Sequence, residues 1–152
     1  MTDTVITDFA LPSTGNTTFK LSAQRGKNVV LYFYPKDNTP GCTVEGQEFR
    51  DLYPQFEAAN TVVVGVSRDS LKSHEGFKTK QGFPFELLSD TEGILCERFS
   101  VMKQKNMYGK LVRGIERSTF VFDKTGQRVK EWRGLKAPGH AAEVLAFVQG
   151  LG

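Results

Sequence analysis

The chain has 152 residues, about the length of one domain; 39% of the residues are hydrophobic and twelve are phenylalanine, so the chain can bury a core and is not a disordered protein. Its net charge is only +3 and its basic residues are scattered, so the composition does not indicate a nucleic-acid-binding protein. Because no apolar run approaches the roughly 18 residues of a membrane helix, and the start of the chain lacks the basic and apolar regions of a signal peptide, we expect one cytoplasmic domain over residues 1–152 with no membrane segment.

The first predicted elements are a hairpin and a buried strand. Turn-forming residues at 13–16 separate two short apolar segments at 9–11 and 19–21, a pattern typical of a β-hairpin. Residues 28–34 form a continuous apolar, β-branched and aromatic run, as in a strand that is buried on both faces of a parallel sheet. We therefore expect this segment to be a central strand.

A helix that carries a cysteine in its first turn is predicted next. Thr39 has the residue type of an N-cap, and Pro40 suits the first helical position, where its missing N–H costs nothing. Apolar residues then recur at helical spacing to residue 59, and Pro54 is expected to kink the helix without ending it. Cys42 consequently lies in the first turn.

The middle of the chain alternates strands and helices. A second buried strand is predicted at 61–66, so that the first strand, the helix and this strand form a unit with a right-handed crossover. A helix at 70–81, a short strand at 85–88 and a short helix at 91–99 follow. Residues 101–115 are expected to be less regular.

The last part of the chain predicts an antiparallel hairpin and a closing helix. Alternating apolar positions at 118–122 and 127–132 flank a turn, and a helix with one apolar face begins near Pro138. The order of elements, βαβ followed by helices and then ββα, is that of the thioredoxin fold with an added N-terminal β-hairpin and an insertion around residues 85–99. We expect an α/β three-layer sandwich, in which a central mixed sheet carries helices on both faces.

The cysteines and histidines do not suggest a disulfide framework or a metal site. Cys42 and Cys96 are too few for the disulfide framework of a small secreted protein, and neither belongs to a CxxC or Cys/His cluster with metal-ligand spacing. His74 and His140 lie far apart in polar stretches of predicted helices, where solvated side chains are favoured. We therefore expect no metal and no cofactor.

Cys42 is the candidate nucleophile. In the first turn of a helix, the positive end of the helix dipole and the unpaired backbone N–H groups favour the thiolate. A dithiol oxidoreductase would have its second cysteine three residues later, but Glu45 occupies that position, which excludes ordinary dithiol exchange at this helix. A single activated thiolate suits attack on a peroxide, which oxidises it to sulfenic acid. Glu45 and Arg50 suit a role in the charge balance near the thiolate, but ion pairing on the helix surface explains them nearly as well, and they are not assigned a catalytic role.

The residues around Cys42 resemble a known family. Residues 35–42, PKDNTPGC, match the P-x-x-x-T-x-x-C motif of the peroxiredoxins. The fuller string FYPKD followed by TPGCTVE resembles the bacterioferritin comigratory protein, or peroxiredoxin Q, branch of that family. Segments at 8–12, 87–90 and 117–123 fall where that branch has similar segments, so the resemblance covers nearly the whole chain.

The resemblance implies a thiol-dependent peroxidase that reduces hydrogen peroxide and organic hydroperoxides without a cofactor. Cys42 is the implied peroxidatic cysteine, and the hydroxyl of Thr39 is implied to hold the peroxide for in-line attack. Pro35 is implied to shield the thiolate from water, and Arg117, from a strand, to stabilise the thiolate and the charge that develops as the O–O bond lengthens. Taken singly, these residues also suit an N-cap, a strand terminator and a surface arginine.

The second half of the catalytic cycle departs from the family pattern. Many members of the branch have a resolving cysteine five positions after the first, where this chain has Gln47, and others place it on the next helix, where residues 70–81 contain none. Core packing is the favoured interpretation of Cys96. The chain would then have no resolving cysteine, so we expect a one-cysteine enzyme that is reduced by an external thiol such as thioredoxin or glutaredoxin. The alternative is an atypical two-cysteine enzyme in which Cys96 resolves after local unfolding.

Two other classes of function stay open. One is a thioredoxin-fold binding module that has lost its second cysteine, and the other is a redox sensor that passes oxidation to a partner protein. A binding module has no reason to combine Thr39, Cys42 and Arg117, whereas a sensor shares this site and differs only in turnover. The expected partners are a hydroperoxide substrate and a thiol reductant, with no nucleic acid and no membrane, and the resemblance implies a monomer.

Overall fold

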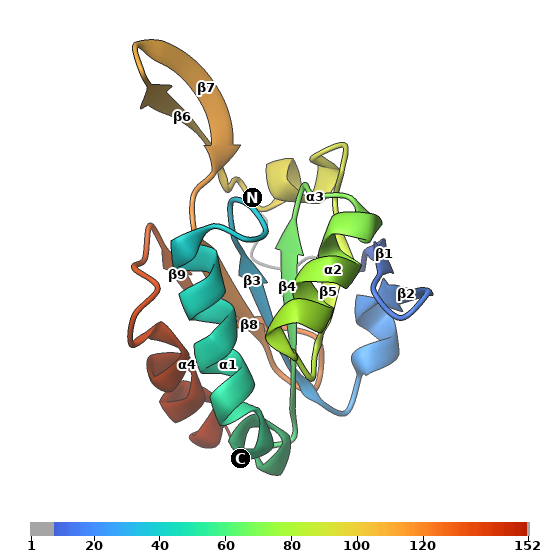
Figure 1. The fold of residues 1–152 in the computed structure, drawn as a ribbon. Helices are drawn as coiled ribbons and strands as arrows, with labels where there is room; N and C mark the ends of the chain where they lie inside the picture. The colour runs from blue at the N-terminus through green and yellow to red at the C-terminus, as the bar shows by residue number, and fades with distance from the viewer. Residues whose placement is uncertain (1–7, 152) are drawn as a thin grey trace.

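The computed structural model describes residues 8–151, which fold around a mixed β-sheet (Figure 1). Within these residues the sheet has seven strands in the order β2-β1-β5-β4-β3-β8-β9, while β6 and β7 form a separate two-stranded sheet. The strands are β1 (Ala10–Ser13), β2 (Thr17–Lys20), β3 (Asn28–Phe33), β4 (Thr61–Ser67), β5 (Glu86–Ser89), β6 (Met102–Met107), β7 (Lys110–Ile115), β8 (Ser118–Phe122) and β9 (Arg128–Arg133).

Helices cover both faces of the larger sheet. They are α1 (Pro40–Ala58), α2 (Leu71–Gln81), α3 (Ile94–Arg98) and α4 (His140–Gln149), with the 3-10 helix η1 (Leu21–Gln24). Figure 1 shows α1, α2 and α4 in front of the sheet, with α4 beside α1. Buried side chains of these three helices share one hydrophobic core, and side chains of α3 and η1 belong to a second core.

Strand β3 separates the two cores. Val29 and Leu31 belong to the core that α3 covers, whereas Val30 and Tyr32 belong to the core that α1, α2 and α4 cover. Successive side chains of a strand point to opposite faces of the sheet, so β3 is buried on both faces. This explains why consecutive residues of β3 are apolar. The predicted central strand and the predicted three-layer sandwich are therefore confirmed.

The strand directions make the sheet mixed, as predicted. β3 runs parallel to β4 and antiparallel to β8. Farther out, β5 runs parallel to β4, and β9 runs antiparallel to β8. The N-terminal hairpin of β1 and β2 extends the sheet beyond β5, with Ser13 opposite Leu88. The sheet thus ends at β2, a strand of four residues, and at β9, whose sequence RVKEWR is rich in charge.

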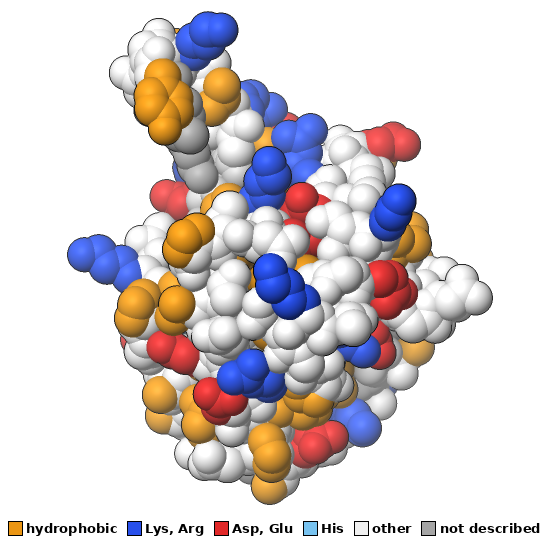
Figure 2. All heavy atoms as spheres, in the orientation of Figure 1, with side chains coloured by type: hydrophobic (Ala, Val, Ile, Leu, Met, Phe, Trp, Pro, Cys, Tyr) orange, Lys and Arg blue, Asp and Glu red, His pale blue; other side chains and the backbone are white. Residues whose placement is uncertain are grey.

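Residues 101–115 contain a regular hairpin, which corrects the expectation of a less regular stretch. β6 and β7 pair antiparallel over six residues each, and Tyr108 and Gly109 form the turn with φ values of 56° and 81°. Two positive φ values are those of the type I′ turn that suits tight hairpins. The hairpin projects away from the sheet (Figures 1 and 2), and Leu111 is 72% exposed. Among its described residues, the hairpin packs against a core only at its base, through Met102 and Ile115. Its sequence therefore lacks the apolar alternation that predicts a strand.

Helix α1 continues through Pro54 to Ala58, in agreement with the prediction that this proline does not end it. The helix approaches its neighbours closely at Gly46, where a Cβ atom would overlap the ring of Phe83. The absence of a side chain at Gly46 therefore lets the helix pack directly against this ring.

The surface mixes charged and apolar side chains. Lys and Arg side chains are spread over the face in Figure 2 among acidic ones. Ile94 on α3 is the large apolar side chain with the greatest exposure outside the hairpin among the described residues, at 62%. Within residues 8–151, no helix combines the length and the apolar character needed to cross a membrane.

Candidate active site

Cys42 lies in the first turn of α1, immediately after the loop that follows β3. Pro40 is the first helical residue and Thr39 is the N-cap, with extended backbone angles of −88° and 154°. The Cys42 side chain is almost completely buried, at 2% exposure. The helix start therefore places the thiol at the inner surface of the loop, where backbone N–H groups of the first turn have no partner within the helix.

Thr39 occupies the N-cap position but does not cap the helix with its side chain. Its Oγ1 donates a hydrogen bond to the carbonyl oxygen of Lys36 at 2.7 Å. Since this bond uses the hydroxyl proton, the lone pairs of Oγ1 are left to accept a hydrogen bond from another group. A hydroxyl that only accepts suits the O–H of a peroxide bound beside Cys42.

Arg117 contacts Cys42 from the segment just before β8, the strand that pairs with β3. It lies in the two-residue connection between β7 and β8, which corrects the expectation that it belongs to a strand. The next residue, Ser118, pairs with Phe33 at the end of β3, so the sheet register brings Arg117 to the loop that leads into α1. Its Nη1 lies 3.6 Å from Cys42 Sγ and donates to Glu45 Oε1 at 2.7 Å.

Gly41 makes room for this arginine. A Cβ atom at Gly41 would lie 2.9 Å from Arg117 Nη2, closer than a guanidinium and a methyl group can approach. The guanidinium therefore lies against the backbone of the first helical turn, and its side chain is only 16% exposed. A cation held this firmly stabilises negative charge without having to reorganise during a reaction.

Glu45 belongs to the site, although the sequence did not assign it a role. Its carboxylate is fully buried and pairs with Arg117 through Oε1, while Oε2 has no hydrogen-bond partner. Burial raises the pKa of Glu45 to about 7, against the opposing effect of the Arg117 charge. The sequence did contain one signal for a role of Glu45 at the site. Glu45 stands three residues after Cys42, and residues three apart on a helix share a face.

Pro35 lies in the loop between β3 and α1, two residues after the end of β3, and is partly buried. Its position on the loop that carries Thr39 is compatible with the shielding role that the resemblance implies. That role stays a prediction.

Cys96 lies on the other side of the sheet. It is fully buried in α3, in the core that includes Leu31 and Phe33, whereas Cys42 belongs to the opposite core. Its backbone N–H donates to Asp90 Oδ2 at 2.8 Å, and burial raises the pKa of its thiol well above the ordinary value. The sheet therefore separates the two free thiols, and the structure agrees with the interpretation of Cys96 as a core residue.

Both histidines are buried, which corrects the expectation of solvated side chains. His74 is 0% exposed and His140 is 3% exposed. His74 shares the inner face of α2 with Phe77, and His140 Nε2 lies 2.9 Å from the hydroxyl of Thr119. The helix carrying His74 is otherwise so polar that its buried face is hard to find from the sequence alone.

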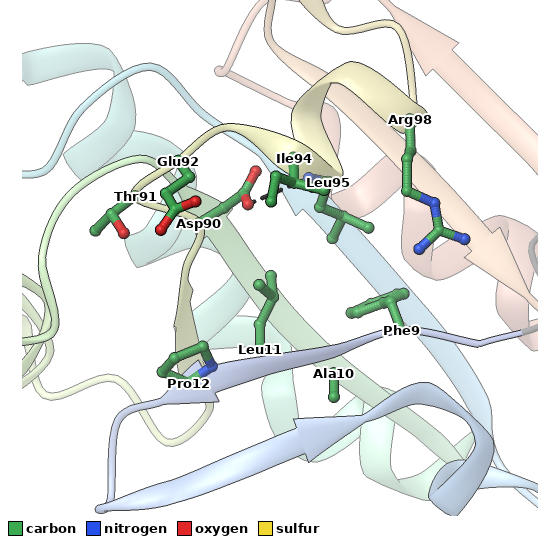
Figure 3. Close-up of a pocket in the computed structure, with 10 residues that line it drawn as sticks. All are labelled: Phe9, Ala10, Leu11, Pro12, Asp90, Thr91, Glu92, Ile94, Leu95 and Arg98. Carbon is green, nitrogen blue, oxygen red and sulfur yellow. Dashed lines mark hydrogen bonds between the residues drawn. The ribbon is translucent and has the colours of Figure 1, made fainter.

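A surface hollow of about 330 Å³ lies away from this site, between β1 and the segment that leads into α3 (Figure 3). Apolar side chains of both segments and the charged side chains of Glu92 and Arg98 line it. It adjoins the core that contains Cys96, and none of the residues around Cys42 contributes to it. The candidate active site is therefore the thiol at the start of α1 and not this hollow.

Comparisons with known proteins identify relatives over nearly the whole chain. Residues 2–130 match the AhpC/TSA family. The chain is 52% identical to peroxiredoxin Bcp of Xanthomonas campestris, covering 98% of this chain and 97% of that protein, and 50% identical to peroxiredoxin Bcp of Bacillus subtilis, covering 91% and 88%.

Solved structures agree with the sequence relatives. The bacterioferritin comigratory protein of Xanthomonas campestris, whose structures concern its alkyl peroxide reduction activity, has a TM-score of 0.89 at 51% identity, covering 94% of this chain and 91% of that one. A peroxiredoxin Q of Xylella fastidiosa has a TM-score of 0.90 at 50% identity, covering 99% and 93%. The segment that matches the family contains the loop, the start of α1 and Arg117. This chain therefore belongs to the AhpC/TSA family, in the Bcp or peroxiredoxin Q branch of the peroxiredoxins.

Proposed function

We propose that Cys42 is the residue with which this thiol-dependent peroxidase reduces hydroperoxides. The Cys42 thiolate attacks one peroxide oxygen, so that an S–O bond forms and the O–O bond breaks. Cys42 becomes sulfenic acid, and the departing oxygen takes up a proton to give water or an alcohol. Hydrogen peroxide and organic hydroperoxides are the proposed substrates, the latter supported by the alkyl peroxide reduction of the Xanthomonas campestris relative.

The contact between Arg117 Nη1 and Cys42 Sγ, at 3.6 Å, is the observation that carries this proposal. A guanidinium at this position stabilises the thiolate before the reaction and the charge on the oxygens during it. Thr39 accepts a hydrogen bond from the peroxide and orients it for in-line attack, and Pro35 limits the access of water.

We also propose that the enzyme is of the one-cysteine type. The sulfenic acid is reduced by an external thiol, such as that of thioredoxin or glutaredoxin, which forms a mixed disulfide with Cys42 and then releases it by thiol–disulfide exchange. The position of Cys96 supports this proposal, because a bridge needs Cα atoms within roughly 7 Å and the two thiols lie in cores on opposite faces of the sheet. A resolving role for Cys96 would require α1 or α3 to leave the sheet.

The test is intact mass and free-thiol content after one equivalent of hydrogen peroxide, for wild type, Cys42→Ser and Cys96→Ser. The one-cysteine proposal expects wild type to gain one oxygen with Cys96 still free, and Cys96→Ser to turn over peroxide with an external thiol. A loss of two protons in wild type, together with loss of turnover in Cys96→Ser, identifies Cys96 as the resolving residue. Peroxide consumption by Cys42→Ser at the wild-type rate contradicts the whole assignment.

Turnover also separates the peroxidase from a redox sensor, because a sensor is oxidised once and is not recycled by a small thiol at a matching rate. A monomeric state and a cytoplasmic location stay predictions. Light scattering coupled to size-exclusion chromatography tests the first, and cell fractionation tests the second.

A further inference from the structure

A buried polar network joins the loop before Cys42 to helix α2. Asp37, in the middle of that loop, is 4% exposed, and its carboxylate is surrounded by donors. Tyr34 Oη donates to Asp37 Oδ1 at 2.6 Å, Ser73 Oγ donates to Oδ2 at 2.8 Å, and His74 Nδ1 lies 2.7 Å from Oδ2. Tyr34 is 1% and His74 0% exposed, so these bonds are shielded from water, where hydrogen bonds to charged groups are strongest.

Both ring nitrogens of His74 have polar partners. Nε2 lies 2.9 Å from the carbonyl oxygen of Leu88, which can only accept, so Nε2 is the donor in this bond. Nδ1 lies 2.7 Å from Asp37 Oδ2 and 3.4 Å from Tyr34 Oη. Asp69 adds a second carboxylate close to the ring. The ring therefore links Asp37, in the loop, to the backbone of β5.

A second set of bonds fixes the backbone of the loop. The N–H of Asp37 donates to Asp69 Oδ2 at 2.9 Å, and Ser67 Oγ donates to the same oxygen at 2.5 Å. Ligand atoms of Asp37, Asp69 and His74 lie within 4.8 Å of one another, but hydrogen bonds already engage all three groups. The cluster is therefore a closed network that fastens the loop and not a free set of cation ligands.

The fastened point is close in sequence to the chemistry. Asp37 stands two residues before Thr39 and five before Cys42, and Asn38 between them has a left-handed backbone with φ of 64°. Because a single residue separates Asp37 from Thr39, a shift of Asp37 is passed on to Thr39. The hydroxyl of Thr39 in turn bonds to the carbonyl of Lys36, on the other side of Asp37.

We propose that His74 is a positioning residue for the peroxide step: its ring holds Asp37, and through Asp37 it sets the place of the Thr39 hydroxyl relative to Cys42. The inference rests on the proposed roles of Cys42 and Thr39. It extends the site to helix α2. His74 is expected to affect reaction with peroxide and to leave the intrinsic reactivity of the Cys42 thiolate beside Arg117 unchanged.

The test compares two reactions of the same thiol in His74→Gln. Misplacement of a substrate-orienting group by a fraction of an ångström is expected to lower kcat/KM for hydrogen peroxide about tenfold. Alkylation of reduced Cys42 by iodoacetamide needs no orienting hydroxyl, and its rate is expected to stay within about twofold of wild type. Cys96→Ser is the background for all variants, so that alkylation reports on one thiol.

Matched variants separate this effect from general damage. Lys72→Gln removes a positive charge from the exposed side of the same helix and is expected to leave both rates unchanged. Ser73→Ala removes one of the donors to Asp37 while keeping His74, and is expected to lower the peroxide rate about threefold. This milder change keeps the proposal testable if His74→Gln does not fold.

The bond from the ring to β5 has its own readout. The imidazole nitrogen resonances that disappear in His74→Gln are expected to show, in wild type, a proton on Nε2, because that nitrogen faces a carbonyl oxygen. A ring with no proton on Nε2, an unchanged peroxide rate in His74→Gln, or an equal loss of peroxide and iodoacetamide rates each overturns the positioning role. Peroxide consumption by Cys42→Ser would instead refute the proposed function and the inference with it, so the two failures are distinguishable.

Discussion

Replacing Glu45 with glutamine removes a buried carboxyl whose ionisation opposes folding. The pKa of this group is raised by burial from 4.5 to about 7. Because the folded-state pKa is higher than the unfolded one, folding favours the protonated carboxyl. Its contribution to stability is therefore fully present below pH 4.5 and is lost as the pH rises through 7.

The magnitude follows from the size of the shift. A rise of about 2.5 pKa units corresponds to roughly 3.4 kcal/mol between the two protonation states, of which roughly 2.5 kcal/mol is lost between pH 5 and pH 8. The side chain is fully buried, so solvent screening does not reduce this value. Glutamine keeps the shape of the side chain and does not ionise.

The assay is urea unfolding of wild type and Glu45→Gln at pH 5 and pH 8. The unfolding free energy of wild type minus that of the variant should fall by about 2.5 kcal/mol from the lower to the higher pH. Taking this difference cancels the titration of all other groups. Glu57→Gln, at an exposed position on the same helix, is the control and should show no such change.

A difference that is the same at both pH values refutes the reasoning. It would mean that Glu45 is ionised throughout, and that the Arg117 charge outweighs the cost of burying the carboxylate.

Three further substitutions, the last with a matched control, test the packing of the site and the cores. Gly41→Ala places a methyl group 2.9 Å from a guanidinium nitrogen of Arg117, so kcat/KM for hydrogen peroxide should fall about tenfold in stopped-flow assays; an unchanged value would show that the guanidinium can move freely. Cys96→Ala leaves a small cavity at a fully buried position and should cost about 1 kcal/mol in urea unfolding with the peroxide rate in the presence of an external thiol retained. Gly46→Ala forces a methyl group against an aromatic ring and should lower the free energy of unfolding by about 1–3 kcal/mol in the same assay. Its control, Gly76→Ala, faces open space on α2 and should raise the free energy of unfolding by up to about 1 kcal/mol. Equal effects of the two alanines would contradict the packing argument.

Local signals predicted the start of the site well. The apolar run of β3 and the helix start at Thr39 and Pro40 placed Cys42 in the first turn of α1. Both signals are local, because a buried strand and a helix start are each recognised from a few consecutive residues. Arg117 stands 75 residues from Cys42. Only the family resemblance suggested that it meets Cys42, since spacing along the chain does not determine sheet register.

The features that the sequence analysis missed depend on tertiary packing. Glu45 looked like a surface residue because its partner comes from a distant connection, and His74 looked solvated because α2 exposes most of its polar side chains. The hairpin of β6 and β7 carried no apolar alternation because it projects from the body of the protein. In each case, the position relative to the sheet decides burial, and the local composition does not reveal it.

The two open edges of the sheet affect how readily copies of the folded chain aggregate. An edge strand presents unpaired N–H and C=O groups, to which a strand from another molecule can add. β2 provides only four residues for such pairing, and β9 carries Arg128, Lys130, Glu131 and Arg133 within six residues. Another β9 laid antiparallel against it over its full length would place Arg128 opposite Arg133. Ordered aggregation is thus disfavoured at one edge by its length and at the other by its charge.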